Sequence, residues 1–218
     1  MKTPLTRLIA TTIFAALALV RAPLTASAQQ PLIPAAKIDS GRYGYTKADV
    51  AFISGMIGHH AQAVVMAGWA SSHGVNSSLA ILCRRIVVAQ TAEIELMQEW
   101  LKARAEKVPG PNAKHDMAGM SMPGMAMGDT LMPGMLTPAQ MAQLDKARGV
   151  EFDRLFLKFM IQHHEGALAM VAKLFGTQGA AQDDFVFTFA TNVHADQETE
   201  IERMQQMLEA LPPERRTP

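Results

Sequence analysis

Two pairs of adjacent histidines are the first candidates for chemistry in this sequence of 218 residues. His59 and His60 form one pair, and His163 and His164 form the other. Imidazole is the commonest protein ligand for transition metals, and a buried imidazole without a full set of partners costs roughly 1–3 kcal/mol. The pairs therefore indicate a metal site. The alternative is a set of core histidines satisfied by hydrogen bonds to neighbouring helices.

Methionines and carboxylates recur near these histidines at helical spacing. Residues three or four positions apart lie on one face of a helix, so thioethers near each pair share its face. Two later segments repeat the pattern Gln-x-x-Glu-Ile-Glu-x-Met, and an inward-facing glutamate there would approach the histidines. The candidate ligands from these patterns are Met56, Met66, Met160 and Met170 beside the histidines, and Glu93, Met97, Glu200 and Met204 in the later segments.

A methionine-rich segment lies between the two halves of the chain. Seven of the 21 residues from 115 to 135 are methionine, and the glycines and prolines among them exclude a regular helix. Thioethers are soft ligands that favour Cu(I) or Ag(I) over Mg, Ca or Zn, so this segment predicts the identity of the metal. Its candidate ligands are His115, Met117, Met120, Met122, Met125, Met127, Met132 and Met135. The alternatives are a plain flexible linker, or a surface for an apolar partner.

Capping signals predict four helices that position these residues. Thr46 with Asp49, and Thr137 with Pro138 and Gln140, are typical helix starts. Two blocks of the first half recur in the second, at offsets of 104 and 107 residues, which indicates one helical hairpin used twice. Two such hairpins should pack as an all-α four-helix bundle. The predicted helices cover residues 46–74, 76–107, 137–176 and 183–211.

The chain divides into four predicted parts. A basic start, an apolar run too short to span a bilayer well, and Ala26-Ser27-Ala28 are typical of a cleaved secretory signal. Export of this kind implies a periplasmic or secreted protein with no stable membrane span after cleavage. The parts are a signal peptide at 1–28, a leader at 29–45, a bundle at 46–211 and a tail at 212–218; within the bundle, hairpins at 46–107 and 137–211 flank a flexible linker at 108–136.

Charge and cysteine content narrow the function further. The chain has 20 basic residues (Lys and Arg) and 20 acidic residues (Asp and Glu). Because there is no excess of positive charge, nucleic acid is not expected as a partner. The single Cys83 cannot form an internal disulfide and reads as a small buried hydrophobe, with a ligand role as the alternative. His194 stands next to the Gln197 face, where it could join a second site only.

The His-His blocks and the Gln-x-x-Glu-Ile-x-x-Met blocks resemble the bacterial family called domain of unknown function 305. The resemblance covers nearly all of residues 46–211. It implies a ferritin-like four-helix bundle and, in some members, copper binding through histidine and methionine outside the cytoplasm. The methionine-rich segment is similar, by composition, to segments of copper and silver resistance proteins.

The resulting prediction is an exported protein that sequesters or hands on copper, Cu(I) first, with Ag(I) or Cu(II) as alternatives. Its expected partners are the metal ion and a copper-transport or copper-efflux protein, and a homo-oligomer is left open. A di-metal oxidoreductase is the enzymatic alternative, but the Glu-x-x-His motif of such sites does not occur in the chain, and no catalytic constellation is recognised. A metal-free structural or partner-binding bundle is the third hypothesis.

Overall fold

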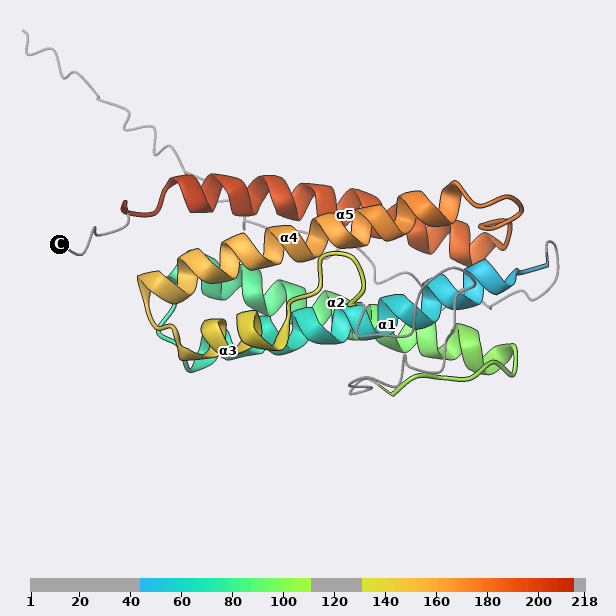
Figure 1. Cartoon of the computed structure of the whole chain (residues 1–218), viewed down its shortest axis with the longest axis horizontal. Coiled ribbons are helices and arrows are strands. Elements are labelled where there is room, and N and C mark those ends of the chain that lie inside the picture. The colour runs from blue at the N-terminus through green and yellow to red at the C-terminus, as the bar shows by residue number, and fades with distance from the viewer. Residues whose placement is uncertain (1–43, 111–130, 214–218) are drawn as a thin grey trace, which may run out of the picture. The chain divides into compact units, whose positions relative to one another are not determined.

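The computed structural model describes residues 44–110 and 131–213, and these residues form an all-α bundle (Figure 1). Helix α1 packs against α2 as one hairpin and α4 packs against α5 as a second, and the hairpins meet through α1 and α4. The elements are α1 (Lys47–Gly68), the short 3-10 helix η1 (Trp69–Ser71), α2 (Ser77–Ala103), α3 (Pro138–Lys146), α4 (Val150–Phe175) and α5 (Asp184–Glu209).

The predicted helix starts are confirmed by their hydrogen bonds. The Thr46 hydroxyl accepts from the backbone N–H of Asp49, and the Asp49 carboxylate accepts from the N–H of Thr46. Thr137 and Gln140 form the same reciprocal pair at the start of α3. Each of these reciprocal pairs, called a capping box, gives partners to backbone N–H groups that have none within the helix, which is why these sequences begin helices.

The prediction of one continuous helix from 137 to 176 is wrong. The chain leaves the helix at Ala147 and restarts at Val150, so a separate α3 precedes α4. Gly149 has a φ of +58°, a conformation that side-chain-bearing residues rarely adopt. Its N–H donates to the carbonyl of His73 at 2.8 Å, which ties this break to the end of the first hairpin. Similarly, α2 ends at Ala103, four residues before its predicted end.

The core consists of two apolar clusters with a polar layer between them. The Trp100 cluster consists mainly of buried apolar residues from within 52–57, 94–101, 167–174 and 186–193, and the Phe152 cluster mainly of those from within 63–67, 79–86, 152–160 and 201–204. Every long helix thus contributes to both clusters. The polar layer comprises the buried residues between them: His59, His60, Gln90, His163, His164 and Gln197.

Burial explains the strongly apolar composition of α1. By length and composition, α1 with η1 could cross a membrane, yet 61% of its apolar window is buried inside the bundle. Its partners there are α2 and α4. Burial on two sides is the usual reason for such a composition in a core helix.

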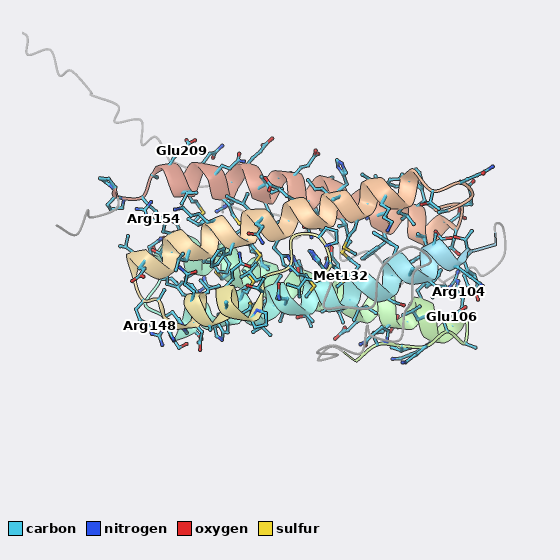
Figure 2. All side chains as sticks on the ribbon, in the orientation of Figure 1. Arg104, Glu106, Met132, Arg148, Arg154 and Glu209 are labelled. Atoms are coloured by element: carbon cyan, nitrogen blue, oxygen red, sulfur yellow. The ribbon has the colours of Figure 1, made fainter. Side chains whose placement is uncertain are left out.

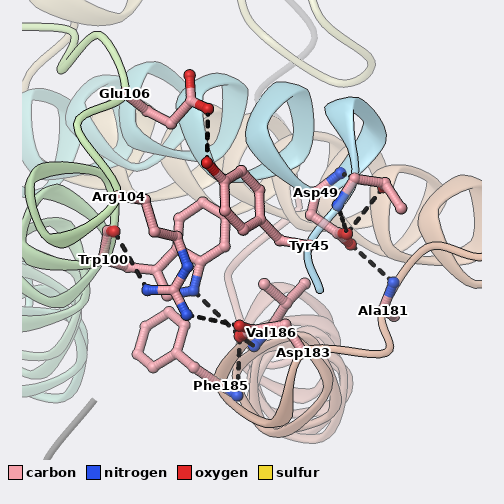
Figure 3. Close-up of polar contacts among 10 residues, drawn as sticks. Tyr45, Asp49, Trp100, Arg104, Glu106, Ala181, Asp183, Phe185 and Val186 are labelled. Atoms are coloured by element: carbon pink, nitrogen blue, oxygen red, sulfur yellow. Dashed lines mark hydrogen bonds and ion pairs between the residues drawn. The ribbon is translucent and has the colours of Figure 1, made fainter. Parts of the chain in front are cut away.

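A buried ion pair joins the two hairpins at the Trp100 end (Figure 3). Asp183 accepts from Arg104 at 2.5 Å and from the Trp100 indole N–H at 3.0 Å, and it also caps α5 through two backbone N–H groups. Arg104 in turn lies over the Trp100 ring. Close by, the Asp49 carboxylate accepts from the N–H of Ala181 at 2.7 Å. These bonds fix how α2 meets the start of α5.

Replacing Asp183 by alanine should destabilise the bundle by about 3–5 kcal/mol, because it leaves the Arg104 charge buried without a partner and removes a helix cap. Denaturant unfolding followed by circular dichroism measures this loss. The neighbouring Asp184 is exposed, so Asp184→Ala is the matched control and should change the free energy of unfolding by less than about 0.5 kcal/mol. Equal effects of the two substitutions would contradict the assignment.

Candidate functional site

The four predicted histidines lie together in the polar layer, and none is exposed to solvent. Adjacent residues of a helix point about 100° apart, so the two members of each pair face different neighbours. His59 on α1 and His163 on α4 face one another across the bundle, with ring centroids 3.8 Å apart. His60 and His164 instead face α2 and α5, respectively. The central pair is therefore shared between the hairpins.

The outer histidines each bond to a predicted glutamate. His60 Nε2 lies 2.8 Å from a carboxylate oxygen of Glu93, and His164 Nε2 lies 2.6 Å from one of Glu200. A carboxylate accepts, so the Nε2 of each ring carries the hydrogen, and in the neutral form of the ring Nδ1 has the lone pair. The glutamate side chains are 21% and 22% exposed, so they join the buried rings to the surface.

The central histidines have fewer partners. His59 Nε2 donates to the backbone carbonyl of Pro133 at 2.9 Å, and neither ring nitrogen of His163 has a partner. Across the four rings, five buried nitrogens have none: Nδ1 of His59, His60 and His164, and both nitrogens of His163. The side-chain oxygens of Gln90 and Gln197 are also unpartnered, although both residues are buried. If the histidines were only structural, each buried ring nitrogen would need a hydrogen-bond partner, and most of these nitrogens have none.

Burial keeps the central rings neutral. It lowers the pKa of His59 from 6.5 to about 3, assisted by the nearby His60, and the bond to Pro133 only partly opposes this. Burial likewise lowers the pKa of His163 well below its usual range; His59, His164 and His60 add to the effect, and a contact with the backbone of His59 opposes it only in part. A neutral imidazole offers a lone pair, which is the form that binds metals.

The predicted methionine ligands lie on both sides of the polar layer. Five of them are fully buried in the two apolar clusters, whereas Met170 is half-buried beside the Trp100 cluster. On the Trp100 side are Met56, Met97 and Met170, and on the Phe152 side are Met66, Met160 and Met204. Among residues 44–110 and 131–213, no three His, Cys, Asp or Glu side chains form a group that could hold an ion. The side chains in or beside the layer that could donate to an ion are the imidazoles, the flanking thioethers and the two glutamates.

The end of the methionine-rich segment is fixed to the bundle. Residues 131–136, here called the strap, cross α1 and α4 (Figure 1). Gln62 on α1 exchanges two hydrogen bonds with the backbone of Leu136, and Gln162 on α4 donates to the carbonyl of Gly134. The linker predicted at 108–136 is therefore anchored at this end, where it supplies the carbonyl that bonds His59.

The strap contains two of the predicted ligands, Met132 and Met135, both half-buried. The other candidates of that segment lie outside the described residues: His115, Met117, Met120, Met122, Met125 and Met127. Sequence reasoning missed Gln62 and Gln162. A signal was present, because the two positions pair with glycines in the repeat: Gln62 with Gly166, and Gln162 with Gly58.

Two further candidates lie apart from the histidines. His194 on α5 is 45% exposed and pairs with Glu198 on its own helix at 3.3 Å, away from the buried layer. Cys83 is buried in the Phe152 cluster, as expected, and burial raises the pKa of its thiol to about 12. The thiol therefore stays protonated at neutral pH, which disfavours a ligand role.

The metal-free protein should lose stability as the pH falls from about 6 to about 4. In this range the unfolded chain binds protons on His59 and His163 that the folded chain excludes, so each contributes up to about 1.4 kcal/mol per pH unit. Urea unfolding with a chelator present measures the slope. His163→Leu should reduce it by that amount, and His194→Leu, at an exposed site, should not. An unchanged slope in His163→Leu would refute the assignment.

Comparisons with known proteins agree with the all-α fold. The family model of a domain of unknown function (DUF305) matches residues 49–208. None of the curated proteins matches the chain. The crystal structure of a presumed secreted DUF305 protein from Streptomyces coelicolor is 26% identical, with a TM-score of 0.62, and the match covers 74% of this chain and 92% of that one.

The protein CopM is similar in three metal-bound structures. Its Cu(II)-bound form is 26% identical with a TM-score of 0.57, and the match covers 74% of this chain and 95% of CopM. Its Cu(I)-bound and silver-bound forms match over the same shares at 24% and 23% identity, with TM-scores of 0.54 and 0.51. The family model spans nearly the whole bundle, including both histidine pairs, and the chain therefore belongs to the DUF305 family.

Proposed function

We propose that this protein binds copper at the polar layer, as Cu(I) first, with Ag(I) or Cu(II) as alternatives. The observation that carries the proposal is the set of five buried imidazole nitrogens without a partner. Unpartnered buried polar atoms are rare in folded proteins because each costs about 1–3 kcal/mol. Coordination to an ion would satisfy them.

The hydrogen bonds also favour metal binding by particular atoms. Ligating histidines commonly donate their second N–H to a carboxylate or a backbone carbonyl, which fixes the ring and its tautomer. Glu93, Glu200 and Pro133 are such partners for the Nε2 atoms of three rings. Nδ1 is then the donor atom in those rings, and methionines supply soft ligands on either side.

The comparisons support the choice of metal. CopM has been crystallised with Cu(II), Cu(I) and silver, and it shares the fold of this chain. All three ions suit imidazole or thioether ligands. For the present chain, copper therefore follows from two independent supports: the donor chemistry and the bound ions of a protein with the same fold.

The proposed role is copper sequestration or delivery outside the cytoplasm, in metal homeostasis or resistance. Residues 1–28 would direct export as a cleaved signal, and the methionine-rich segment would collect soft ions near the bundle. Delivery requires a second protein, for which a copper-transport or copper-efflux protein is the natural class. A homo-oligomer is compatible with this role.

A metal-free structural bundle explains the same residues less well. It requires each buried histidine to be satisfied by a neighbouring helix. His60 and His164 meet this condition at one nitrogen only, and His163 meets it at neither. The observed hydrogen bonds orient three of the rings, but every ring keeps at least one nitrogen without a partner.

Removing the central histidines should weaken copper binding. The mature protein, titrated anaerobically with Cu(I) against a competing chelator, should take up the ion, and the His59→Ala/His163→Ala variant should bind at least about tenfold more weakly, because lost ligands cost more than lost supporting bonds. His194→Ala serves as the control because this residue pairs on the surface. Uptake no greater than that of a generic helical protein would sink the proposal.

Replacing residues 111–130 by a Gly-Ser segment of equal length should lower the number of Cu(I) ions bound per chain. The replacement removes five methionines and His115 but keeps the strap and its hydrogen bonds. Equilibrium dialysis with metal analysis gives the stoichiometry. If the count is unchanged, the segment is only a linker, and copper binding belongs to the bundle alone.

A further inference from the structure

Met132 of the strap lies against α1 at a point where that helix has glycines (Figure 2). A Cβ atom added to Gly55 would be 3.1 Å from the Met132 sulfur, and one added to Gly58 would be 3.5 Å from its methyl carbon. The side chain therefore runs along a groove that exists because α1 has no side chains there. The groove is called the Gly55 notch below.

A second methionine reaches the same point from another helix. The methyl carbon of Met170, on α4, would be 3.4 Å from a Cβ at Gly55. The ends of Met132 and Met170 thus converge over one glycine. Both side chains are half-buried, whereas Met56 and Met66 on α1 are fully buried in the core. An ion can reach this thioether pair without opening the bundle.

The notch exists in only one half of the chain. In the second hairpin, Phe159 takes the place of Gly55, and Gln162 takes the place of Gly58. The strap is held over the notch by close backbone contact, since a Cβ at Gly166 would lie 2.0 Å from the Pro133 carbonyl oxygen. Gly166 in turn replaces Gln62 of the first hairpin. These three pairs of repeat positions differ between the two hairpins, and each has a residue that contacts the strap.

We propose that the Gly55 notch is a second soft-ion site, in which Met132 and Met170 bind Cu(I) or Ag(I) through their thioether sulfurs. The proposal rests on the copper-binding function and adds a site outside the polar layer. His59, one helical turn after Gly55 on the same face, bonds to the carbonyl of Pro133, the residue next to Met132. The notch therefore lies beside the part of the strap that bonds to the buried histidines.

The chemistry of the notch selects soft monovalent ions. Two thioethers carry no charge and bind hard divalent ions such as Mg²⁺, Ca²⁺ or Zn²⁺ poorly. Leucine fills an apolar groove as well as methionine does, and the strap itself has leucines at 131 and 136. Methionine at 132 adds a sulfur at a position of the strap where a second sulfur-bearing side chain, Met170, also ends.

Silver(I) is the probe for the test, because it is redox-inert and ligates to thioethers as Cu(I) does. The intact chain, labelled with ¹³C at its methionine methyl groups, is titrated with Ag(I) and followed by NMR. The Met132 and Met170 methyl resonances should shift together, at one point in the titration. In Met132→Leu, the shift of the Met170 methyl resonance should be lost, or should require at least about tenfold more Ag(I), because one ligand has been removed.

The control is Met141→Leu, because Met141 on α3 is half-buried against the Phe152 cluster, away from the notch. Methionine-to-leucine changes conserve volume, so all variants should keep the fold. An unaltered Met170 shift in Met132→Leu overturns the notch site. Shifts of histidine ring resonances without any shift of these two methyls also overturn it, while leaving the proposed function intact. If Ag(I) perturbs no resonance, both proposals fall.

Discussion

The burial of six polar side chains in one layer is the constraint on which the rest of the structure depends. Each long helix contributes apolar residues above and below the layer, so the bundle can form only if the four helices keep one register. The layer itself opposes folding, because seven of its nitrogen and oxygen atoms have no partner. The two apolar clusters must offset that penalty. An ion that binds only the folded chain would add its binding free energy to stability, and the bundle would then be most stable when loaded.

The partners of the histidines decide which atoms face the interior. Glu93 and Glu200 come from α2 and α5, whereas the carbonyl of Pro133 comes from the strap, yet all three bond to Nε2 of a ring. Each therefore leaves Nδ1 as the free donor. The two partly exposed glutamates also connect the buried histidines to the surface of the bundle. Burial raises the pKa of the nearby Asp196, and repulsion by Glu93 and then by Glu200 raises it further, while Arg85 partly opposes the rise.

The helical bundle could be predicted from the sequence because its helix-capping residues and helical spacings form the same local structures in the folded chain. The capping boxes at Thr46 and Thr137 follow from spacing alone. Spacing also predicted that Glu93 and Glu200 approach the histidines if their helix faces point inward, but it did not identify His60 and His164 as their partners. The break between α3 and α4 could not be predicted in this way, since the apolar pattern continues across it. What interrupts the helix is the bond from Gly149 to His73, two residues 76 positions apart in the chain. Similarly, nothing in the composition of residues 115–135 distinguishes its last residues as an anchored strap.

The strap changes the meaning of the repeat. Two identical hairpins would give a symmetric layer with equal access from either side. Here Gln62 and Gln162 hold the strap, and Gly58 and Gly166, at the matching positions, leave room for it. Each hairpin thus has one glutamine that bonds to the strap and one glycine that leaves space for it. The glycine comes first in the first hairpin, and the glutamine comes first in the second. The strap covers α1 and α4, while the carboxylates lie on α2 and α5. The four histidines therefore have unlike surroundings on the two sides of the bundle: the strap with its methionines over α1 and α4, and the two glutamates on α2 and α5.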